Sequence, residues 1–378
     1  MDKGTQLIHN GHDVDPATGA LGVMVYQTST YYRKDIRVVQ EFDYSRGSNP
    51  TRKALEETIA SLEGGAKGYA FASGMSGISS VLGMLSAGDH IVIAEDVYGG
   101  SRYIAETFYK RWGLESTAVN TQDPDNISRA LKPHTKALYL ESPSNPLLKI
   151  TDLRACLKIA HEQGLLSIVD NTFMTPYLQR PIALGADIVV HSATKYLGGH
   201  CDVIAGLAVT RTQELGQKLY QIQNSFGAVP GPWDAWLVMR GIKTLKVRIE
   251  TQQDSALKIA AWLLQHNRVA EVRYPGLPGH PGRDVHFSQA SGGGAMLSFK
   301  TKTTEQALNF YQRIKLALAA PSLGGVETIA SYPVKMSHIN MPVPEREAMG
   351  ITDTLIRISV GLETPEDLIA DFDQALSG

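Results

Sequence analysis

The chain has 378 residues, of which 43% are hydrophobic and 20% are charged. This composition is typical of an ordinary globular protein with a sizeable core, and it excludes a chain that is disordered throughout. Its 36 Lys and Arg residues nearly balance 38 Asp and Glu residues, which excludes an electrostatic footprint for nucleic acid or an anionic membrane. The two cysteines are too few for a disulfide framework or a multi-cysteine zinc site.

The N-terminal residues lack the basic and apolar pattern of a signal peptide. No apolar run approaches the ~18–20 residues that span a bilayer. We therefore expect a cytoplasmic protein. The 11 histidines show no H-E-x-x-H or similar ligand spacing, so we expect no catalytic metal.

The predicted elements begin after an arm. Residues 1–49 contain a short β-prone stretch at 23–32 and a polar loop at 44–49. Asn49 and Pro50 then predict the start of a helix that Gly64 and Gly65 end. From there, short apolar runs alternate with helices. We expect strands at 68–72, 90–95, 137–141, 167–170, 188–192 and 204–209. One helix is expected to end near residue 85, and another to span residues 100–112. This alternation predicts an α/β fold with a mostly parallel sheet covered on both faces.

The pattern changes near residues 231–232 to a long helical stretch at 233–265. Strands are expected at 272–274 and 295–299, followed by more helix. We interpret this part as a smaller α+β domain. The predicted organisation is an arm (1–49), a large domain (50–240) and a C-terminal domain (241–378).

Functional loops gather at the carboxyl ends of the strands in such sheets. The Gly-rich turn at 73–77 precedes a helix, where backbone N–H groups suit a phosphate, although an ordinary turn explains the same residues. Asp170 closes the apolar run 165–169. A buried carboxylate there needs a cation or hydrogen-bond donors, and an N-cap of the next helix explains it equally well.

The strand at 188–192 leads directly to Lys195. This residue is either an ordinary surface lysine or an amine with a lowered pKa that can form a Schiff base, with Ser192 and Thr194 as phosphate donors. Arg357, alone in the apolar run 355–359, suits a substrate carboxylate or a structural ion pair. A phosphate cradle, a buried acid, a reactive lysine and a carboxylate clamp are together what a pyridoxal 5′-phosphate enzyme needs.

Several longer motifs carry a resemblance that covers nearly the whole chain. They are Tyr44-Ser45-Arg46 before Asn49-Pro50-Thr51-Arg52, Val97-Tyr98-Gly99-Gly100, Glu141-Ser142-Pro143-Ser144-Asn145-Pro146, Asp170-Asn171-Thr172, and Ser192 to Lys195 before Tyr196-Leu197-Gly198-Gly199-His200. On these motifs the sequence resembles the Cys/Met-metabolism family of pyridoxal-phosphate enzymes (trans-sulfuration enzymes). The resemblance implies an aspartate-aminotransferase-like fold, fold type I.

The resemblance also implies roles for individual residues. Lys195 would carry the cofactor aldehyde, Asp170 would pair with the pyridine nitrogen, and Tyr98 would stack on the ring and move a proton at the leaving group. The implied phosphate contacts are the backbones of Gly74 and Met75, the side chains of Ser192 and Thr194, and Tyr44 and Arg46 of a neighbouring subunit. Arg357 would bind the substrate α-carboxylate, helped by Asn145 and Ser322. Because the site is shared, a dimer is the minimum active form, and the resemblance implies a homotetramer built from two such dimers.

The implied activity is that of a carbon–sulfur lyase of sulfur amino-acid metabolism. We expect β-elimination of L-cystathionine to homocysteine, pyruvate and ammonia. Many γ-enzymes of the family carry Glu where this chain has Pro321, and Arg where it has Tyr103, with Arg102 one residue earlier. The alternatives are a cystathionine or methionine γ-lyase, then a cystathionine γ-synthase. A fold-related aminotransferase is an alternative from a different enzyme class. The Tyr98-Gly99-Gly100 and Tyr44-Ser45-Arg46 motifs argue against it.

Overall fold

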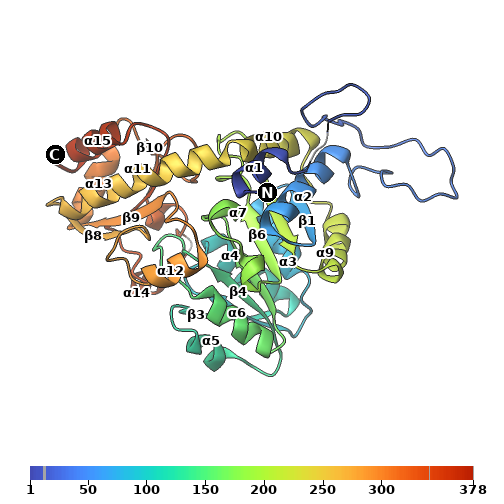
Figure 1. Ribbon diagram of the computed structural model, residues 1–378. Coiled ribbons are helices and arrows are strands. Elements are labelled where there is room, and N and C mark those ends of the chain that lie inside the picture. The colour runs from blue at the N-terminus through green and yellow to red at the C-terminus, as the bar shows by residue number, and fades with distance from the viewer. Residues whose placement is uncertain (12–13, 340, 378) are drawn as a thin grey trace.

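The computed structural model describes residues 1–11, 14–339 and 341–377, which form two β-sheets surrounded by helices (Figure 1). The larger sheet has seven strands in the order β1-β7-β6-β5-β4-β2-β3. All neighbours from β6 to β3 are parallel, whereas β7 is antiparallel to β1 and β6. The strands are β1 (Lys67–Phe71), β2 (His90–Ala94), β3 (Glu115–Val119), β4 (Thr135–Glu141), β5 (Leu166–Asp170), β6 (Ile188–Ser192) and β7 (Gly206–Thr210). The expected α/β fold is confirmed.

The apolar strands of this sheet are buried on both faces. In β4, Leu138 and Leu140 join one hydrophobic core, whereas Ala137 and Tyr139 join the core on the opposite face. Successive side chains of a strand point to opposite faces, so a continuous apolar run indicates that helices cover both. Asp170 is the last residue of β5, which places its carboxylate at the carboxyl edge of the sheet.

The helices cover these faces and connect the strands. They are α1 (Lys3–His9), α2 (Pro50–Glu63), α3 (Gly74–Leu82), α4 (Gly99–Tyr103), α5 (Asp125–Ala130), α6 (Leu153–Glu162), α7 (Thr175–Leu178), α8 (Pro181–Leu184), α9 (Gln213–Phe226), α10 (Pro232–Lys243), α11 (Leu245–Gln265), α12 (Arg283–Gln289), α13 (Thr304–Arg313), α14 (Val343–Ala348) and α15 (Pro365–Ser377). As predicted, Asn49 begins α2 by accepting hydrogen bonds from the N–H groups of Thr51 and Arg52, and left-handed Gly64 ends it. No described helix is long and apolar enough to span a bilayer.

The smaller sheet has the strand order β10-β11-β12-β9-β8. Its strands are β8 (Val269–Arg273), β9 (Met296–Thr301), β10 (Leu318–Ala319), β11 (Ile329–Ser331) and β12 (Leu355–Ser359). Apolar residues of α11, α13 and α15 pack on these strands to form a separate core. Figure 1 shows α11 running from beside this sheet toward α10 and the larger sheet. The predicted domain boundary at residue 240 falls within α10 and stays a prediction.

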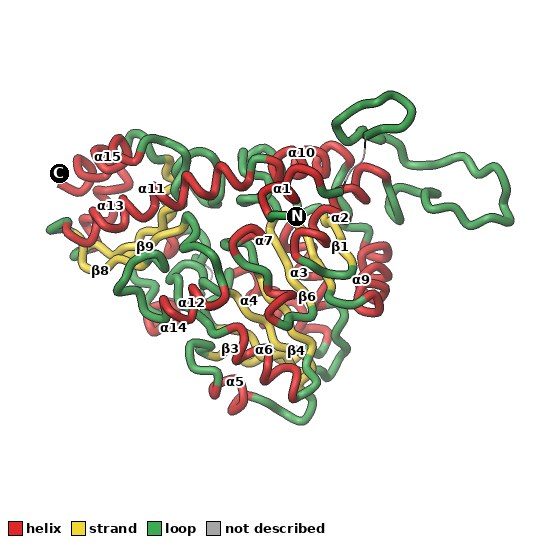
Figure 2. Tube along the Cα trace, viewed as in Figure 1, coloured by secondary structure: helices red, strands yellow, loops and turns green. Residues whose placement is uncertain are grey.

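Three local expectations are wrong. The helix expected over 233–265 is two helices, because Thr244 leaves the helical region with φ −103° and ψ 1°. Residues 99–112 form α4 followed by a π-helical turn (Ile104–Phe108) and a 3₁₀ turn (Tyr109–Trp112) rather than one regular helix. The β-prone stretch at 23–32 forms one isolated bridge, between Thr30 and Tyr44. The segment 14–48 projects from the body as a long loop (Figure 2).

Candidate active site

A cavity of about 600 Å³ lies where the strands of the larger sheet end. The parallel strands β4, β5 and β6 bring their last residues, Glu141, Asp170 and Ser192, to its wall, and the smaller sheet contributes Arg357. Ten of the predicted site residues line this cavity: Gly74, Met75, Tyr98, Asn145, Asp170, Ser192, Thr194, Lys195, Ser322 and Arg357. The loops and strands that carry them are far apart in sequence, so the fold alone brings them together.

The beginning of α3 forms one side of the cavity. Ser73 caps this helix by accepting a hydrogen bond from the N–H of Ser76, while the Ser73 N–H donates to Ser76 Oγ. As the first residues of the helix, Gly74 and Met75 have N–H groups without an intrahelical acceptor. A Cβ on Gly74 would lie 2.9 Å from the Cβ of Ser192, so glycine keeps open the space between them. Helix N-termini of this kind bind phosphate.

Asp170 lies on the floor of the cavity and is 6% exposed. Its Oδ1 accepts hydrogen bonds from the Thr172 N–H at 3.0 Å and from the Thr172 hydroxyl at 2.6 Å. Burial raises the pKa of Asp170, and the Thr172 donors oppose that rise. The N-cap alternative is wrong, because α7 begins at Thr175 and Met174 occupies its N-cap position.

The amine of Lys195 points into the same cavity. Its Nζ donates a hydrogen bond to Ser322 Oγ at 2.7 Å. Burial, together with a smaller contribution from the nearby Arg357 guanidinium, lowers the pKa of Lys195 to about 8. The neutral, nucleophilic amine is therefore present near neutral pH in a far larger proportion than for a lysine with the ordinary pKa. The surface-lysine alternative is wrong.

Arg357 is a buried cation held by neutral groups. Its Nη1 donates to Asn145 Oδ1 at 2.8 Å, and its Nη2 donates to the Ser322 carbonyl at 2.7 Å and to Ser331 Oγ at 3.0 Å. No described carboxylate forms a salt bridge with it, and its Nε has no hydrogen-bond partner in the described part of the chain. The structural ion-pair alternative is therefore wrong, and the charge is available to an anionic ligand.

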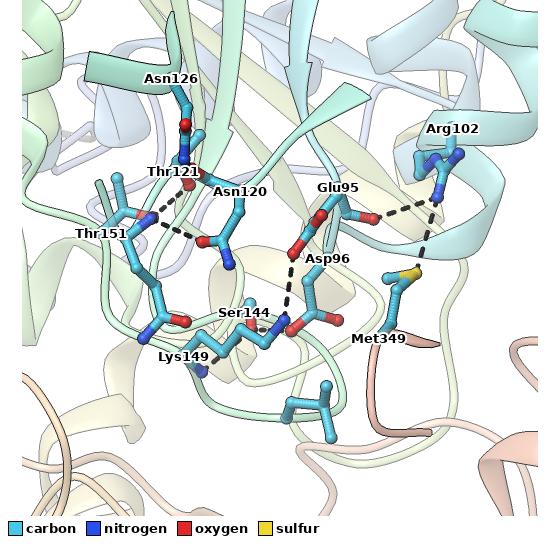
Figure 3. Close-up of polar contacts among 12 residues, drawn as sticks. Glu95, Asp96, Arg102, Asn120, Thr121, Asn126, Ser144, Lys149, Thr151 and Met349 are labelled. Atoms are coloured by element: carbon cyan, nitrogen blue, oxygen red, sulfur yellow. Dashed lines mark hydrogen bonds and ion pairs between the residues drawn. The ribbon is translucent and has the colours of Figure 1, made fainter. Parts of the chain in front are cut away.

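Two hydrogen-bonded loops position Tyr98 and Asn145. The Tyr98 N–H donates to Glu141 Oε2 at 2.8 Å. Directly before Tyr98, Asp96 accepts a hydrogen bond from Ser144 Oγ, and Glu95 forms an ion pair with Lys149 at 3.2 Å (Figure 3). These contacts join the loop that follows β2 to the loop that follows β4. A shift of either loop therefore moves the other.

Sequence reasoning did not assign a role to Glu141, although it lines the cavity and is 5% exposed. Burial, with Asp170 adding to the effect, raises the pKa of Glu141 well above its ordinary value. The available signal was its position, since Glu141 ends β4 beside Asp170 at the end of β5. Lys335 and Ser331 were also missed, because nothing in the local sequence indicates that their segments reach the cavity.

Tyr44 and Arg46 are the two predicted residues that do not line this cavity. They line a second one of about 310 Å³ with Asn49, Arg52 and the 229–232 segment. The Arg46 guanidinium lies 5.5 Å from the centre of the Tyr44 ring. Within one chain, the structure therefore separates the arm from the site that contains Lys195.

The sequence matches the family of Cys/Met metabolism PLP-dependent enzymes over residues 4–377. The chain belongs to this family. It is 50% identical to cystathionine beta-lyase MetC of Bacillus subtilis (strain 168), over 98% of this chain and 95% of that protein. It is 49% identical to the cystathionine gamma-lyase of the same organism, over 100% of this chain and 99% of that protein.

Solved structures agree with this family membership. Cystathionine gamma-lyase from Lactobacillus plantarum, complexed with L-serine, superposes with a TM-score of 0.98 at 44% identity, covering 100% of this chain and 99% of that one. The structure of metB from Corynebacterium glutamicum gives a TM-score of 0.97 at 40% identity, covering 100% and 98%. The expectations of fold type I and of a pyridoxal-phosphate-dependent lyase are confirmed.

The cavity fits the family's cofactor in shape and in chemistry. The open cradle between Gly74 and Ser192 suits a phosphate, and the buried Asp170 carboxylate suits a protonated pyridine nitrogen. The amine of Lys195 suits an aldehyde. Pyridoxal 5′-phosphate is therefore the cofactor of this enzyme.

Proposed function

We propose that this enzyme is a cystathionine β-lyase, which converts L-cystathionine and water to homocysteine, pyruvate and ammonia. One observation carries the proposal: a buried arginine with no carboxylate partner among the described residues and a lysine with a lowered pKa line one cavity with a buried aspartate. Relatives named cystathionine beta-lyase, from Bacillus subtilis and from two Lactococcus lactis strains, are 49–50% identical and support this activity.

In this proposal, cofactor binding is divided among the residues that sequence analysis singled out. The N–H groups of Gly74 and Met75 and the hydroxyls of Ser192 and Thr194 hold the phosphate. Asp170 keeps the proton on the pyridine nitrogen, and Tyr98 stacks on the ring. When bound, the cofactor draws electron density away from the substrate Cα.

The chain's own groups then move the protons. Arg357 binds the α-carboxylate and orients the substrate. The amine of Lys195 takes the proton from Cα, which its lowered pKa permits because the neutral amine is present near pH 7. The C–S bond breaks with its electron pair on sulfur, and a proton moved by Tyr98 gives homocysteine. The three-carbon product adds water and separates into pyruvate and ammonia.

A second candidate is γ-elimination, which breaks the other C–S bond of L-cystathionine and yields cysteine, 2-oxobutyrate and ammonia. The 49% identical gamma-lyase from Bacillus subtilis favours it. Product analysis after adding L-cystathionine to the purified holoenzyme separates the two. We expect pyruvate with homocysteine from the parent and no elimination from the Lys195→Ala variant.

Other products would contradict the proposal. Cysteine with 2-oxobutyrate would assign the γ-reaction, and turnover only with an activated homoserine ester would assign a γ-synthase. Amino-group transfer to an added 2-oxo acid would assign an aminotransferase. Turnover retained by Lys195→Ala with bound cofactor would remove Lys195 from its proposed role.

We also propose that the arm (1–49) completes the site of a neighbouring subunit in a homotetramer of two dimers, beside the large (50–240) and C-terminal (241–378) domains. Tyr44 and Arg46 then reach the partner's phosphate. The arm exposes large apolar side chains, including Leu21, Tyr32 and Val39, which a neighbour would cover. Because the cofactor and amino acids are metabolites of the cell interior, we propose a cytoplasmic location.

A further inference from the structure

Among the described residues, three cationic side chains line the large cavity: Lys195, Arg357 and Lys335. The first two have roles in the proposed function. Lys335 ends the 3₁₀ turn Pro333–Lys335, and its side chain is exposed to solvent at the cavity wall. No described acidic group forms a salt bridge with Lys335. Its charge is therefore not already neutralised by the protein.

The segment that carries Lys335 is packed closely against the turn that carries Tyr98. A Cβ on Gly99 would lie 2.6 Å from the carbonyl oxygen of Ser337, so only glycine permits this approach. Lys335, Met336 and Ser337 line the cavity together with Tyr98. This segment is therefore within the part of the cavity that a ligand near Tyr98 can contact.

Two arginines fix the position of the same segment. Arg346 of α14 donates to the Val334 carbonyl at 3.4 Å and to Asp353 at 3.0 Å. Arg102 of α4 contacts Glu345 at 2.6 Å and Met349 Sδ at 3.8 Å, the latter shown in Figure 3. The backbone of Lys335 is thus held at the cavity mouth, while its four-carbon side chain remains free to reach a ligand.

The proposed substrate supplies an anion for this cation. L-cystathionine carries a carboxylate at each end, and Arg357 binds only the one beside the reacting carbon. Of the described cations that line the cavity, Lys195 and Arg357 already have roles, which leaves Lys335 for a second carboxylate. Building on the proposed function, we propose that Lys335 binds the distal carboxylate of L-cystathionine and thereby favours it over cysteine conjugates that lack this group.

The test compares two substrates on matched variants of the holoenzyme. S-Ethyl-L-cysteine offers the same C–S bond without a distal carboxylate. We expect Lys335→Met to lose about tenfold in kcat/KM for L-cystathionine, mainly through KM, a loss that corresponds to one exposed ion pair of roughly 1.4 kcal/mol. Its kcat/KM for S-ethyl-L-cysteine should stay within about twofold of the parent. Lys335→Arg should retain most of the cystathionine activity.

Lys158→Met, which removes an exposed lysine from α6, serves as the control and should leave kcat/KM unchanged for both substrates. An equal loss on both substrates, or no loss on either, overturns the assignment of Lys335 while leaving the proposed function intact. A parent enzyme that cleaves S-ethyl-L-cysteine but not L-cystathionine overturns both the proposed function and the assignment. An unchanged cofactor absorbance spectrum in Lys335→Met shows that the cofactor site is intact.

Discussion

The positive charge of Arg357 acts on Lys195 as well as on a ligand. Because both side chains occupy one cavity sheltered from water, the guanidinium disfavours the charged form of the lysine, and burial acts in the same direction. The hydrogen bond from Lys195 Nζ to Ser322 Oγ has a neutral acceptor. It therefore stabilises the charged form of the lysine less than a carboxylate partner would. The pKa of about 8 therefore depends on Arg357 remaining in place.

This dependence predicts the pH profile of cofactor uptake. The neutral amine reacts with the aldehyde, so the uptake rate of the cofactor-free protein should rise with pH through about 8, not near the ordinary 10.5. Arg357→Gln removes a neighbouring positive charge and should move that midpoint to higher pH. Stopped-flow absorbance measures both profiles. A midpoint that stays the same in Arg357→Gln would show that burial alone sets the pKa of Lys195.

The N-terminus of α3 and the end of β6 form the cradle as a pair. Gly74 permits this arrangement because a side chain there would enter the space beside Ser192. The same approach is seen at the start of β7, where a Cβ on Gly206 would collide with the Ser73 carbonyl at less than van der Waals distance. Glycine at both positions lets the backbone at the start of α3 approach the ends of β6 and β7 closely, so that its N–H groups can face the proposed phosphate.

Gly74→Ala should therefore weaken cofactor binding by about tenfold or more, since it both fills the cradle and displaces Ser192. Gly279→Ala is the matched control, because a Cβ at that position meets nothing within 4 Å. Titration of the cofactor-free variants with pyridoxal 5′-phosphate gives the two affinities. Equal affinities for Gly74→Ala and the parent would place the phosphate elsewhere.

Sequence patterns predicted the elements whose signals are local. The apolar strands β4, β5 and β6 and the capped start of α2 lie where expected. The edge strand β3 was missed because three of its five residues are polar and none of the five is fully buried. The break between α10 and α11 was also missed, and nearby Gly241 lies directly against the carbonyl of Gly198. No local pattern records that contact.

The residues of the candidate site likewise fall into those that the sequence predicted and those that it did not. Family motifs identified the residues that converge at the strand ends, and all ten of those expected within one chain line the cavity. Glu141 and Lys335 were missed because their contribution depends on which segments meet in space. Arg357 was ambiguous in the sequence, and only the absence of a carboxylate partner among described residues removed the ion-pair alternative.

The position of the projecting arm bears on how subunits assemble. The end of the arm that joins α2 is fixed by Arg52, a buried side chain that donates a hydrogen bond to the Arg46 carbonyl at 3.1 Å. The Arg46 side chain itself lines the separate smaller cavity and not the one that contains Lys195 of the same chain. In the proposed dimer, each site therefore combines Lys195 of one subunit with Arg46 of the other.

Mixing two inactive variants tests this sharing. Co-refolded or co-expressed Arg46→Ala and Lys195→Ala chains should form mixed dimers that contain one site with both native residues. About a quarter of all sites are then intact if the chains pair at random. Elimination activity should recover toward that fraction, whereas each variant alone stays low. Mixed dimers without recovered activity would place Arg46 outside the partner's site.

The contact between Arg357 and Asn145 joins residues 212 positions apart. A ribosome making this chain therefore produces Asp170, Lys195 and the proposed phosphate cradle long before it adds Arg357. Until β12 has been made and inserted between β11 and β9, the growing chain lacks its proposed anchor for an amino acid.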